Sequence, residues 1–364
     1  MSFVPRGGSR AGVGFPERMR QHGGVTIVEG RPIGWGVLST GHIASVLAKD
    51  LALLPEEATL VGVGSRSADK AAAFAAEYGF QHSHGSYAEL AADADVDVVY
   101  VATPHNDHFP SAKLCLEGGK SVLVEKPLTV SPQEGEELLA LARERGLFVM
   151  EAMWTRTHPL IRHAAELVAS GELGEVRHVD AQFGFAFDGP GSHRLLDPAQ
   201  AGGAILDAGV YPVHAVNLFL GEPAEVLGSG THAATGVDDH AAALLSYPAT
   251  SERGAATASI LCTLRAALPN RLSVYCTKGR VMFDDFFLRP AELSVYREGV
   301  DAPEELIASW PGGGYTFEAQ EVMRCLRAGD LESPLVPWSA TLAVSRTLAR
   351  WQDAVGTPAR STGV

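Results

Sequence analysis

The sequence has too few cysteines, too far apart, for a disulfide framework or a zinc ribbon. It contains four cysteines in 364 residues, and no two of them form a CxxC pair. These are Cys115, Cys262, Cys276 and Cys325. Disulfide-rich folds and structural zinc sites depend on closely spaced cysteines. The chain is therefore expected to fold around hydrophobic cores in a reducing compartment, and the cytoplasm suits it.

Long apolar runs are also missing. A membrane-spanning helix needs about 20 predominantly apolar residues. The best candidate, residues 201–220, is interrupted by Asp207, Pro212 and His214. Residues 1–30 carry four arginines and many glycines but lack the apolar stretch of a secretory signal, and we interpret them as a flexible N-terminal arm. The sequence predicts no membrane partner.

Basic clusters and metal-ligand motifs are scarce as well. Lys and Arg number 29 against 43 Asp and Glu, so the formal net charge is −14. Binding to phosphates requires clustered Lys and Arg, and no nucleic-acid partner is therefore expected. The thirteen histidines include no HExxH or comparable ligand set. No metal is predicted, and a zinc-dependent alcohol dehydrogenase is disfavoured.

The residues that are present indicate an ordinary globular protein of two domains. The composition is 46% hydrophobic and 20% charged, and a domain usually has about 100–200 residues. Up to residue 152, short apolar runs alternate with helix-like segments, which is typical of βα units around a parallel sheet. The predicted strands are 33–38, 59–65, 96–102, 121–124 and 147–152. We expect a doubly wound α/β domain at 31–152.

The second half of the chain has longer strand-like stretches. They are 176–187, 224–232, 240–247, 255–264 and 272–283, and a tight turn at 277–280 divides the last one. Helical patterns at 204–220, 316–328 and 339–355 are expected to cover one face of this sheet. Residues 153–364 are therefore predicted to form an α/β domain with a mostly antiparallel, open sheet, whose uncovered face suits burial by a second copy.

A loop of small residues follows the first predicted strand. It reads GVLSTGHIA over residues 36–44, with Ser39 and Ala44 in place of the first and third glycines of GxGxxG. In a Rossmann fold such a loop lets a dinucleotide pyrophosphate rest on the helix N-terminus. An ordinary strand-to-helix turn is the alternative, but the position in the first βα unit favours a dinucleotide site.

The end of the second strand carries Ser65 and Arg66 instead of an acidic residue. Sites for NAD usually have Asp or Glu there, about 20 residues beyond the glycines, to hold the ribose 2′-hydroxyl. An arginine can pair with a 2′-phosphate instead. This favours NADP over NAD as the cofactor, although NAD remains possible and Arg66 could be an ordinary solvated residue.

Two further polar segments follow later strands. Residues 103–108 read TPHNDH, and residues 125–127 read EKP. Both leave the carboxyl edge of the predicted sheet, where open α/β folds bind their ligands. A lysine beside a nicotinamide ring can act as an acid or base, whereas an isolated EKP is only a polar turn. Because EKP directly follows a strand in the predicted series of βα units, a catalytic role for Lys126 is favoured.

The second domain adds two motifs. Residues 202–211 read GGAILDAGVY and open a helical pattern, so Asp207 and Tyr211, four residues apart, can address one ligand. A buried hydrogen-bonded pair is the alternative. Residues 151–156 read EAMWTR and lie at the domain crossover. They can line the cleft between the domains or join the domains together, and the sequence does not separate these possibilities.

Taken together, these motifs resemble the Gfo/Idh/MocA oxidoreductase family, and within it the dimeric dihydrodiol dehydrogenases and bacterial sugar dehydrogenases. The resemblance runs from residue 33 to the end of the chain, and EKP followed by GGxxxDxGxY is its specific part. It implies a Rossmann domain, an α/β domain whose open sheet builds homodimers or larger homo-oligomers, and a nicotinamide cofactor. The implied reaction moves a hydride to or from a hydroxyl or carbonyl carbon of a sugar, polyol or dihydrodiol.

The resemblance also assigns roles to residues. Lys126 is the principal acid/base, Asp207 orients the substrate, and Tyr211 stands where many relatives have histidine, which leaves open whether Lys126 or Tyr211 exchanges the proton. His108 matches a position near the nicotinamide, and His105 replaces a more common asparagine. The residues expected to bind the cofactor are Ser39, Thr40, Gly41, His42, Ile43, Ser65, Arg66, Thr103, Pro104, His105, His108, Glu125, Lys126, Trp154 and Arg156.

Two other functions remain open from the sequence. One is a glycosidase that uses a tightly held nicotinamide transiently, and the other is a cofactor-binding sensor without turnover. A glycosidase would release sugar without a net change in nicotinamide absorbance, and a sensor would show no substrate-dependent redox change. The presence of Lys126, Asp207 and Tyr211 together argues against the sensor.

Overall fold

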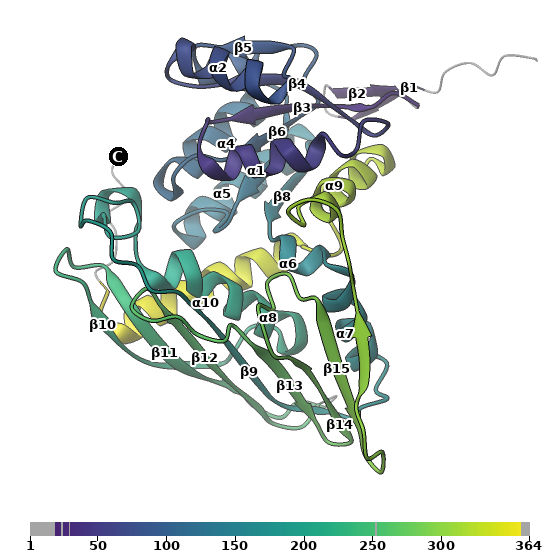
Figure 1. The fold of residues 1–364 in the computed structure, drawn as a ribbon, viewed down its shortest axis with the longest axis vertical. Coiled ribbons are helices and arrows are strands. Elements are labelled where there is room, and N and C mark those ends of the chain that lie inside the picture. The colour runs from purple at the N-terminus through teal and green to yellow at the C-terminus, as the bar shows by residue number, and fades with distance from the viewer. Residues whose placement is uncertain (1–18, 23–24, 29, 252, 358–364) are drawn as a thin grey trace, which may run out of the picture.

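The computed structural model describes residues 19–22, 25–28, 30–251 and 253–357, and two sheets dominate it (Figure 1). The first has six parallel strands in the order β5-β4-β3-β6-β7-β8. They are β3 (Ile33–Leu38), β4 (Ala58–Gly64), β5 (His82–His84), β6 (Val98–Val101), β7 (Ser121–Glu125) and β8 (Val149–Ala152). This is the strand order of a doubly wound dinucleotide-binding domain. The predicted fold class and all five predicted strands are confirmed, whereas β5 was not predicted.

Helices lie on both faces of this sheet, because alternate side chains of each strand point to opposite faces. They are α1 (His42–Leu51), α2 (Ala68–Tyr78), α3 (Tyr87–Ala91), α4 (His108–Glu117) and α5 (Pro132–Arg145). Val37 packs in the same core cluster as Leu47 of α1. The next residue, Leu38, belongs to the cluster that contains Leu116 of α4. The central strands are consequently apolar over most of their length, whereas the edge strand β5 is His-Ser-His.

Two capping motifs, SYAE at residues 86–89 and SPQE at residues 131–134, begin helices in the structure. The Ser86 hydroxyl accepts a hydrogen bond from the Glu89 amide at 3.2 Å, and the Ser131 hydroxyl accepts one from the Glu134 amide at 3.3 Å. Each bond satisfies an amide that has no partner inside its own helix. Both motifs therefore define where α3 and α5 start.

The second sheet has eight strands in the order β10-β11-β12-β9-β13-β14-β15-β16. The strands are β9 (Val176–Gly184), β10 (Glu225–His232), β11 (Asp238–Tyr247), β12 (Ala256–Thr263), β13 (Leu272–Cys276), β14 (Gly279–Phe283), β15 (Glu292–Arg297) and β16 (Glu304–Ile307). All neighbouring pairs are antiparallel except β12 and β9. The predicted open, mostly antiparallel sheet and its turn after Cys276 are confirmed, and β15 and β16 extend it beyond the prediction.

One face of the second sheet is covered by helices, as Figure 1 shows. Helix α8 (Val210–Leu220) packs on β9 and α10 (Trp338–Val355) packs on β10, as predicted. The stretch Pro198–Leu220 is long and apolar enough to cross a membrane by length and composition, but 83% of its most apolar window is buried inside the protein. It is therefore a core segment. Helices α6 (Trp154–Thr157) and α7 (Pro159–Ala169) connect the two sheets.

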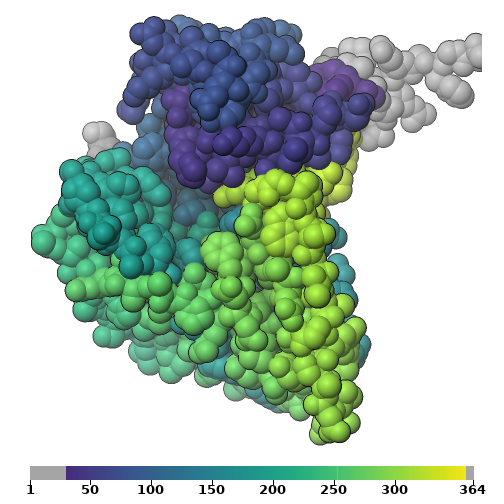
Figure 2. Space-filling view, in the orientation of Figure 1, coloured from purple at the N-terminus to yellow at the C-terminus, as the bar shows by residue number. Residues whose placement is uncertain are grey.

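The prediction for the helix at residues 316–328 was wrong in one respect. Helix α9 (Thr316–Ala328) has the predicted bounds, but it packs against α1 and α6 and not on the second sheet. The reason is an anchor in the loop before it, where the Asp50 carboxylate of α1 accepts hydrogen bonds from the Gly313 and Tyr315 amides, each at 2.7 Å. Figure 2 shows this yellow-green segment against the purple surface of the first domain.

The predicted N-terminal arm falls mostly outside the described residues. Within residues 1–30, the described part forms a two-stranded antiparallel sheet of β1 (Met19–His22) and β2 (Val25–Val28). The interpretation of a flexible arm therefore does not hold for these two strands. The division of the remaining chain at residues 152 and 153 follows the point where β8 ends and α6 begins.

Candidate active site

Lys126 and Asp207 meet where the two domains face each other. Lys126 directly follows β7 at the carboxyl edge of the parallel sheet, and Asp207 lies in a π-helical turn, Ile205–Gly209, before α8. Lys126 Nζ donates a hydrogen bond to the Asp207 carbonyl oxygen at 2.8 Å and lies 3.5 Å from the carboxylate oxygen Oδ1. Both side chains are largely buried. The pair joins a catalytic candidate from each domain.

Glycines and a buried aspartate shape the turn that presents Asp207. Gly203 has a φ of 125° and lies so close to Asp238 that a β-carbon would come within 2.8 Å of its carboxylate. That carboxylate accepts a hydrogen bond from the Ile205 amide at 2.6 Å. At Gly209 a β-carbon would collide with Trp351 of α10. Turns of this π-helical type are frequent at functional sites. Because Gly203 and Gly209 have no side chains, this turn can pack closely against Asp238 and Trp351.

The Asp207 carboxylate is surrounded by three nitrogen-bearing side chains. Arg194 Nη1 lies 2.9 Å from Oδ1, Lys126 Nζ 3.5 Å and His105 Nε2 3.6 Å. Burial alone would raise the pKa of Asp207, but the charges of Lys126 and Arg194 outweigh it and lower that pKa below its usual value. Asp207 is therefore an anion that fixes Lys126. Arg194 was not predicted, because it lies in an irregular loop without a motif.

Tyr211 flanks the same lysine. Lys126 Nζ lies 5.0 Å from the centroid of the Tyr211 ring, and Phe183 packs edge-on against the ring. Asp207 and Tyr211 thus both lie beside Lys126, and their contact with one ligand stays a prediction. Burial, followed by the neighbouring carboxylates of Glu125 and Asp207, raises the pKa of Tyr211 well above its ordinary value. The phenol stays protonated at neutral pH, so it can donate a hydrogen bond.

His105 and His108 occupy different places. His105 faces Asp207, and its Nδ1 lies 3.2 Å from the Ala201 carbonyl oxygen. His108 is completely buried between two loops, with Nδ1 2.8 Å from the Pro127 carbonyl oxygen and Nε2 2.9 Å from that of Thr103. Burial lowers the pKa of His105 to about 3, so this ring is neutral at pH 7. Burial also lowers the pKa of His108, to about 4, although its two carbonyl contacts favour the protonated ring. Through these two contacts His108 links the TPH loop to the EKP loop.

The residue before Lys126 anchors the strand end. The Glu125 carboxylate accepts hydrogen bonds from the Tyr100 hydroxyl and, at 3.2 Å, from the Lys126 amide. Burial raises the pKa of Glu125 above its usual value. Sequence reasoning missed Tyr100, because a buried tyrosine in a central strand gives no signal of its own. It also missed Glu318 of α9, which is fully buried and whose carboxylate oxygens have no hydrogen-bond partner among the described residues.

The loop at residues 36–44 exposes main-chain amides at the start of α1. Ser39 adopts a φ of 98°, a conformation that favours glycine, at the position of the first glycine of the fingerprint. Gly41 is the N-cap of α1, and no side chain caps the helix. Thr40, Gly41, His42 and Ile43 are each at least partly exposed. Three of the first helical amides are therefore available to an anion, which the helix dipole also favours.

The end of β4 presents the predicted arginine. Ser65 is buried and its hydroxyl accepts a hydrogen bond from the Ser67 amide at 3.3 Å. Arg66 is exposed and forms no hydrogen bond or ion pair with any other described residue. Its guanidinium is thus accessible to a ligand at the carboxyl edge of the sheet.

The crossover segment at residues 151–156 mainly joins the domains. The Glu151 carboxylate is hydrogen-bonded to His214 Nε2 of α8 at 3.0 Å, and the Arg156 guanidinium donates to Asn217 Oδ1 at 2.8 Å. Both residues are buried, and burial lowers the pKa of Arg156 to about 10. Trp154 stacks on Tyr315 with the ring centroids 4.6 Å apart. Of the two possibilities left open, the structure favours a joining role for Glu151 and Arg156.

The residues at this edge fit a nicotinamide dinucleotide. The uncapped N-terminus of α1 provides amides for a pyrophosphate, and Arg66 offers an unpaired cation. The Thr103 hydroxyl is buried without a hydrogen-bond partner among the described residues. Unsatisfied buried donors are rare unless a ligand or water completes them. Thr103, Pro104 and Lys126 all follow strands at the edge where such a cofactor would bind.

Comparison with known proteins agrees with this geometry. Residues 33–153 match the oxidoreductase family with an NAD-binding Rossmann fold, and residues 161–282 match the Gfo/Idh/MocA C-terminal domain. The chain is 37% identical to a trans-1,2-dihydrobenzene-1,2-diol dehydrogenase from Bos taurus, over 88% of this chain and 96% of the relative. It is 34% identical to a D-xylose 1-dehydrogenase (NADP(+)) from Hypocrea jecorina, over 86% and 90%.

A solved structure extends the likeness to the whole fold. A 3-ketoreductase from Actinomadura kijaniata, in complex with TDP-benzene and NADP, superposes with a TM-score of 0.72 at 29% identity, covering 90% of this chain and 97% of that one. On the strength of its sequence, its two sheets and its matched domains, this chain belongs to the Gfo/Idh/MocA oxidoreductase family.

Proposed function

We propose that this protein is an NADP(H)-dependent oxidoreductase that transfers a hydride between nicotinamide and the hydroxyl or carbonyl carbon of a sugar, a polyol or a trans-dihydrodiol. The observation that carries the proposal is the position of Lys126 Nζ, which Asp207 holds 2.8 Å from its carbonyl oxygen at the carboxyl edge of the dinucleotide-binding sheet. The dihydrodiol and xylose dehydrogenases to which the chain is similar support the substrate class.

The residues divide the proton chemistry between them. When bound, the nicotinamide supplies or accepts the hydride. Lys126 Nζ has three N–H groups when protonated, and its two contacts with Asp207 leave one for a substrate oxygen. Lys126 donates the proton to that oxygen in reduction and takes it back in oxidation. Tyr211, with its raised pKa, holds the substrate as a neutral hydrogen-bond donor.

The supporting residues act through orientation. Asp207 keeps the Lys126 stem in one place, and Arg194 and His105 in turn restrict the Asp207 carboxylate. Groups fixed in this way avoid the entropy of bringing reactants into position. Glu125 and His108 hold the loop on which Lys126 sits, and we assign them positioning roles rather than contact with the cofactor.

We assign the cofactor preference to Arg66. Its exposed guanidinium, with no ion-pair partner among the described residues, suits a ribose 2′-phosphate, and a carboxylate at this place would repel that group. The name of the similar xylose dehydrogenase specifies NADP(+). NAD would bind without this contact and therefore more weakly.

The defining experiment is a substrate panel followed by nicotinamide absorbance. Aldoses, anhydrosugars and trans-dihydrodiols are tested with NADP⁺ and with NAD⁺. Substrate-dependent reduction of NADP⁺ supports the proposal. Sugar release without net nicotinamide change identifies a transient-redox glycosidase, and cofactor binding without turnover on any substrate identifies a sensor.

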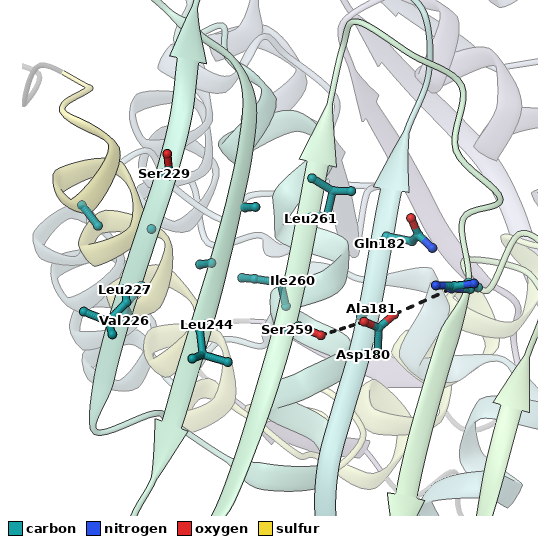
Figure 3. Close-up of a pocket in the computed structure, with 15 residues that line it drawn as sticks. Asp180, Ala181, Gln182, Val226, Leu227, Ser229, Leu244, Ser259, Ile260 and Leu261 are labelled. Carbon is teal, nitrogen blue, oxygen red and sulfur yellow. Dashed lines mark hydrogen bonds and ion pairs between the residues drawn. The ribbon is translucent and has the colours of Figure 1, made fainter.

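We further propose that the protein forms a homodimer or larger homo-oligomer through the uncovered face of the second sheet. Leu227 and Leu244 are cross-strand partners that share this face and are 55% and 44% exposed. They border a hollow of about 830 Å³, which continues across the sheet to Asp180 and Arg271 (Figure 3). The helices of this chain cover only the opposite face, and a second copy would cover this one.

Four free cysteines agree with a reducing compartment, and we propose the cytoplasm as the location. Cys115, Cys262 and Cys325 are buried, and none of the four pairs with another. We also propose the division into a cofactor domain at 31–152 and a substrate and oligomer domain from 153, with the exception that α9 packs on the first of these.

A further inference from the structure

Three potential metal ligands gather at the edge of the first sheet, away from Lys126. His82 and His84 are the first and last residues of the edge strand β5, so their side chains share one face. Asp93 follows helix α3, which packs on that strand. His82 Nδ1 lies 2.7 Å and His84 Nε2 2.9 Å from the same carboxylate oxygen, Asp93 Oδ2. The three ligand atoms lie within 4.8 Å of one another.

The charge around these residues favours a cation. Within the described part of the chain, Asp93 forms ion pairs only with the two histidines, and no lysine or arginine side chain neutralises its carboxylate. The exposed Asp95 lies two residues beyond Asp93 and adds a second carboxylate to this segment. Lys120 binds the Asp93 carbonyl oxygen and not the carboxylate. Lys120 also acts electrostatically on Asp93, but it is shared with Asp95 and Asp97, so the surroundings of the cluster stay acidic.

Access and rigidity are also suitable. The side chains of His82 and His84 are 39% and 20% exposed, whereas Asp93 is nearly buried. Asp93 is held from its other oxygen, Oδ1, by the Asp95 amide at 3.0 Å. Gly62 lies next to the ligands and has no side chain that could crowd them. A β-carbon at this position would lie 3.3 Å from Asp93 Oδ2. An ion can reach the site from solvent while one ligand is fixed in advance.

We propose that His82, His84 and Asp93 bind a divalent transition-metal ion of the zinc type, with solvent in the remaining position. Two imidazoles and one carboxylate are a donor set that suits Zn²⁺ in tetrahedral geometry. On binding, the ion takes the place of the proton between each ring and Asp93. A neutral ring moves that proton to its other nitrogen, and a protonated ring releases it to solvent. The ion would tie the edge strand to the segment after α3.

The site is separate from the reacting groups but adjoins the cofactor edge. The His84 carbonyl oxygen accepts a hydrogen bond from the Ser65 amide at 3.1 Å, and Ser65 precedes the proposed 2′-phosphate ligand Arg66. Figure 1 places β5 at the far edge of the first sheet, remote from the second domain. Bound metal is therefore expected to stabilise the fold and not to take part in hydride transfer.

The test uses the full-length, untagged protein and Zn²⁺ alone. Isothermal titration with Zn²⁺ is compared for the wild type, His82→Gln, His84→Gln and, as a matched control, His163→Gln, which alters an exposed histidine on α7. The expected result is one tight site in the wild type and in the control. Each of the two ligand variants should bind at least about tenfold more weakly, since even an outer-shell change costs that much.

A second readout guards against variants that fold poorly. Zn²⁺ should raise the unfolding temperature of the wild type and of His163→Gln, because a ligand that binds the native state stabilises it. It should not raise that of His82→Gln or His84→Gln. Equal zinc affinity in all four proteins, or no stoichiometric binding by the wild type, would overturn the proposal. In either case the cluster would be only a hydrogen-bonded link between β5 and the segment after α3.

Discussion

Lys126 Nζ is bound twice by one residue, at 2.8 Å by the main-chain carbonyl oxygen of Asp207 and at 3.5 Å by its carboxylate. The main-chain contact persists when the carboxylate is changed, so the two contributions can be separated by mutation. Asp207 belongs to the second domain and Lys126 to the first, and any movement between the domains therefore changes the position of the amine.

Lys126→Met is expected to lower turnover at least about 100-fold, the lower end of general acid–base contributions. Methionine keeps much of the stem volume and removes the group that exchanges the proton, so folding and NADP(H) binding should be retained. Steady-state kinetics with the best substrate of the panel, together with a fluorescence titration of NADPH, measures both. Lys70→Met, at an exposed position on α2, is the control.

The alternative, in which Tyr211 exchanges the proton, is tested with Tyr211→Phe in the same assays. If Tyr211→Phe abolishes turnover while Lys126→Met stays near normal, the proton passes through the tyrosine and Lys126 is not the principal acid/base. A modest loss with Tyr211→Phe fits a neutral hydrogen-bond donor, which is the role that its raised pKa supports.

Arg66→Ala is expected to weaken NADP(H) binding roughly ten- to hundredfold and to leave NAD(H) binding nearly unchanged, because a charge-assisted hydrogen bond contributes about 1.5–3 kcal/mol. Titration of both cofactors measures the ratio. Arg162→Ala, which removes an exposed arginine from α7, should change neither affinity. Equal losses for both cofactors would show that Arg66 does not read the 2′-phosphate.

Ser39→Gly should stabilise the protein by about 0.5–1 kcal/mol. Ser39 adopts a φ of 98°, a conformation that costs a residue with a side chain about 1–3 kcal/mol. Glycine relieves this strain, but its greater flexibility in the unfolded chain offsets part of the stabilisation. Chemical denaturation measures the change. Ser45→Gly, inside α1, should instead destabilise by about 1 kcal/mol. If Ser39→Gly is less stable than the wild type, the Ser39 side chain adds more to the free energy of unfolding than the backbone strain removes.

The buried His105 should make the fold sensitive to mild acid. Its pKa is about 3 in the folded protein and is ordinarily 6.5, so below pH 6.5 the unfolded chain binds the proton more readily. Its contribution to stability is present above pH 6.5 and is lost as the pH falls toward 3. One such group changes the free energy of unfolding by up to about 1.4 kcal/mol per pH unit.

His105→Gln should therefore flatten the dependence of stability on pH between 6 and 4 by up to that amount. Urea unfolding at several pH values measures the slope. His163→Gln, an exposed histidine, should leave it unchanged. An equal slope in wild type and His105→Gln would contradict a neutral, buried His105.

Leu244→Glu is expected to convert the oligomer into monomers at micromolar concentration, because a buried charge without a partner is strongly unfavourable in an interface. Light scattering coupled to gel filtration measures the mass. Leu53→Glu alters another exposed leucine, outside the second sheet, and should leave the oligomer intact. A wild type that is itself a monomer would reject the oligomer altogether.

Local patterns were sufficient for most of the elements. The predicted strand at 33–38 coincides with β3, and the helix predicted at 316–328 coincides with α9. A strand buried on both faces must be apolar along its length, and a packed helix must repeat its apolar positions, so both leave a record in the sequence. The three-residue β5, with the sequence His-Ser-His, leaves no such record.

The sequence by itself determined the two-domain α/β class, the positions of the motifs at strand ends, and the candidates Lys126, Asp207 and Tyr211. Only the tertiary structure decided that Arg194 reaches Asp207, that Tyr100 binds Glu125, and that α9 packs on α1 through Asp50. Secondary structure depends on neighbours a few residues apart, which a pattern records. These contacts join residues 13 to 265 positions apart, and their geometry follows from the packing of the whole chain.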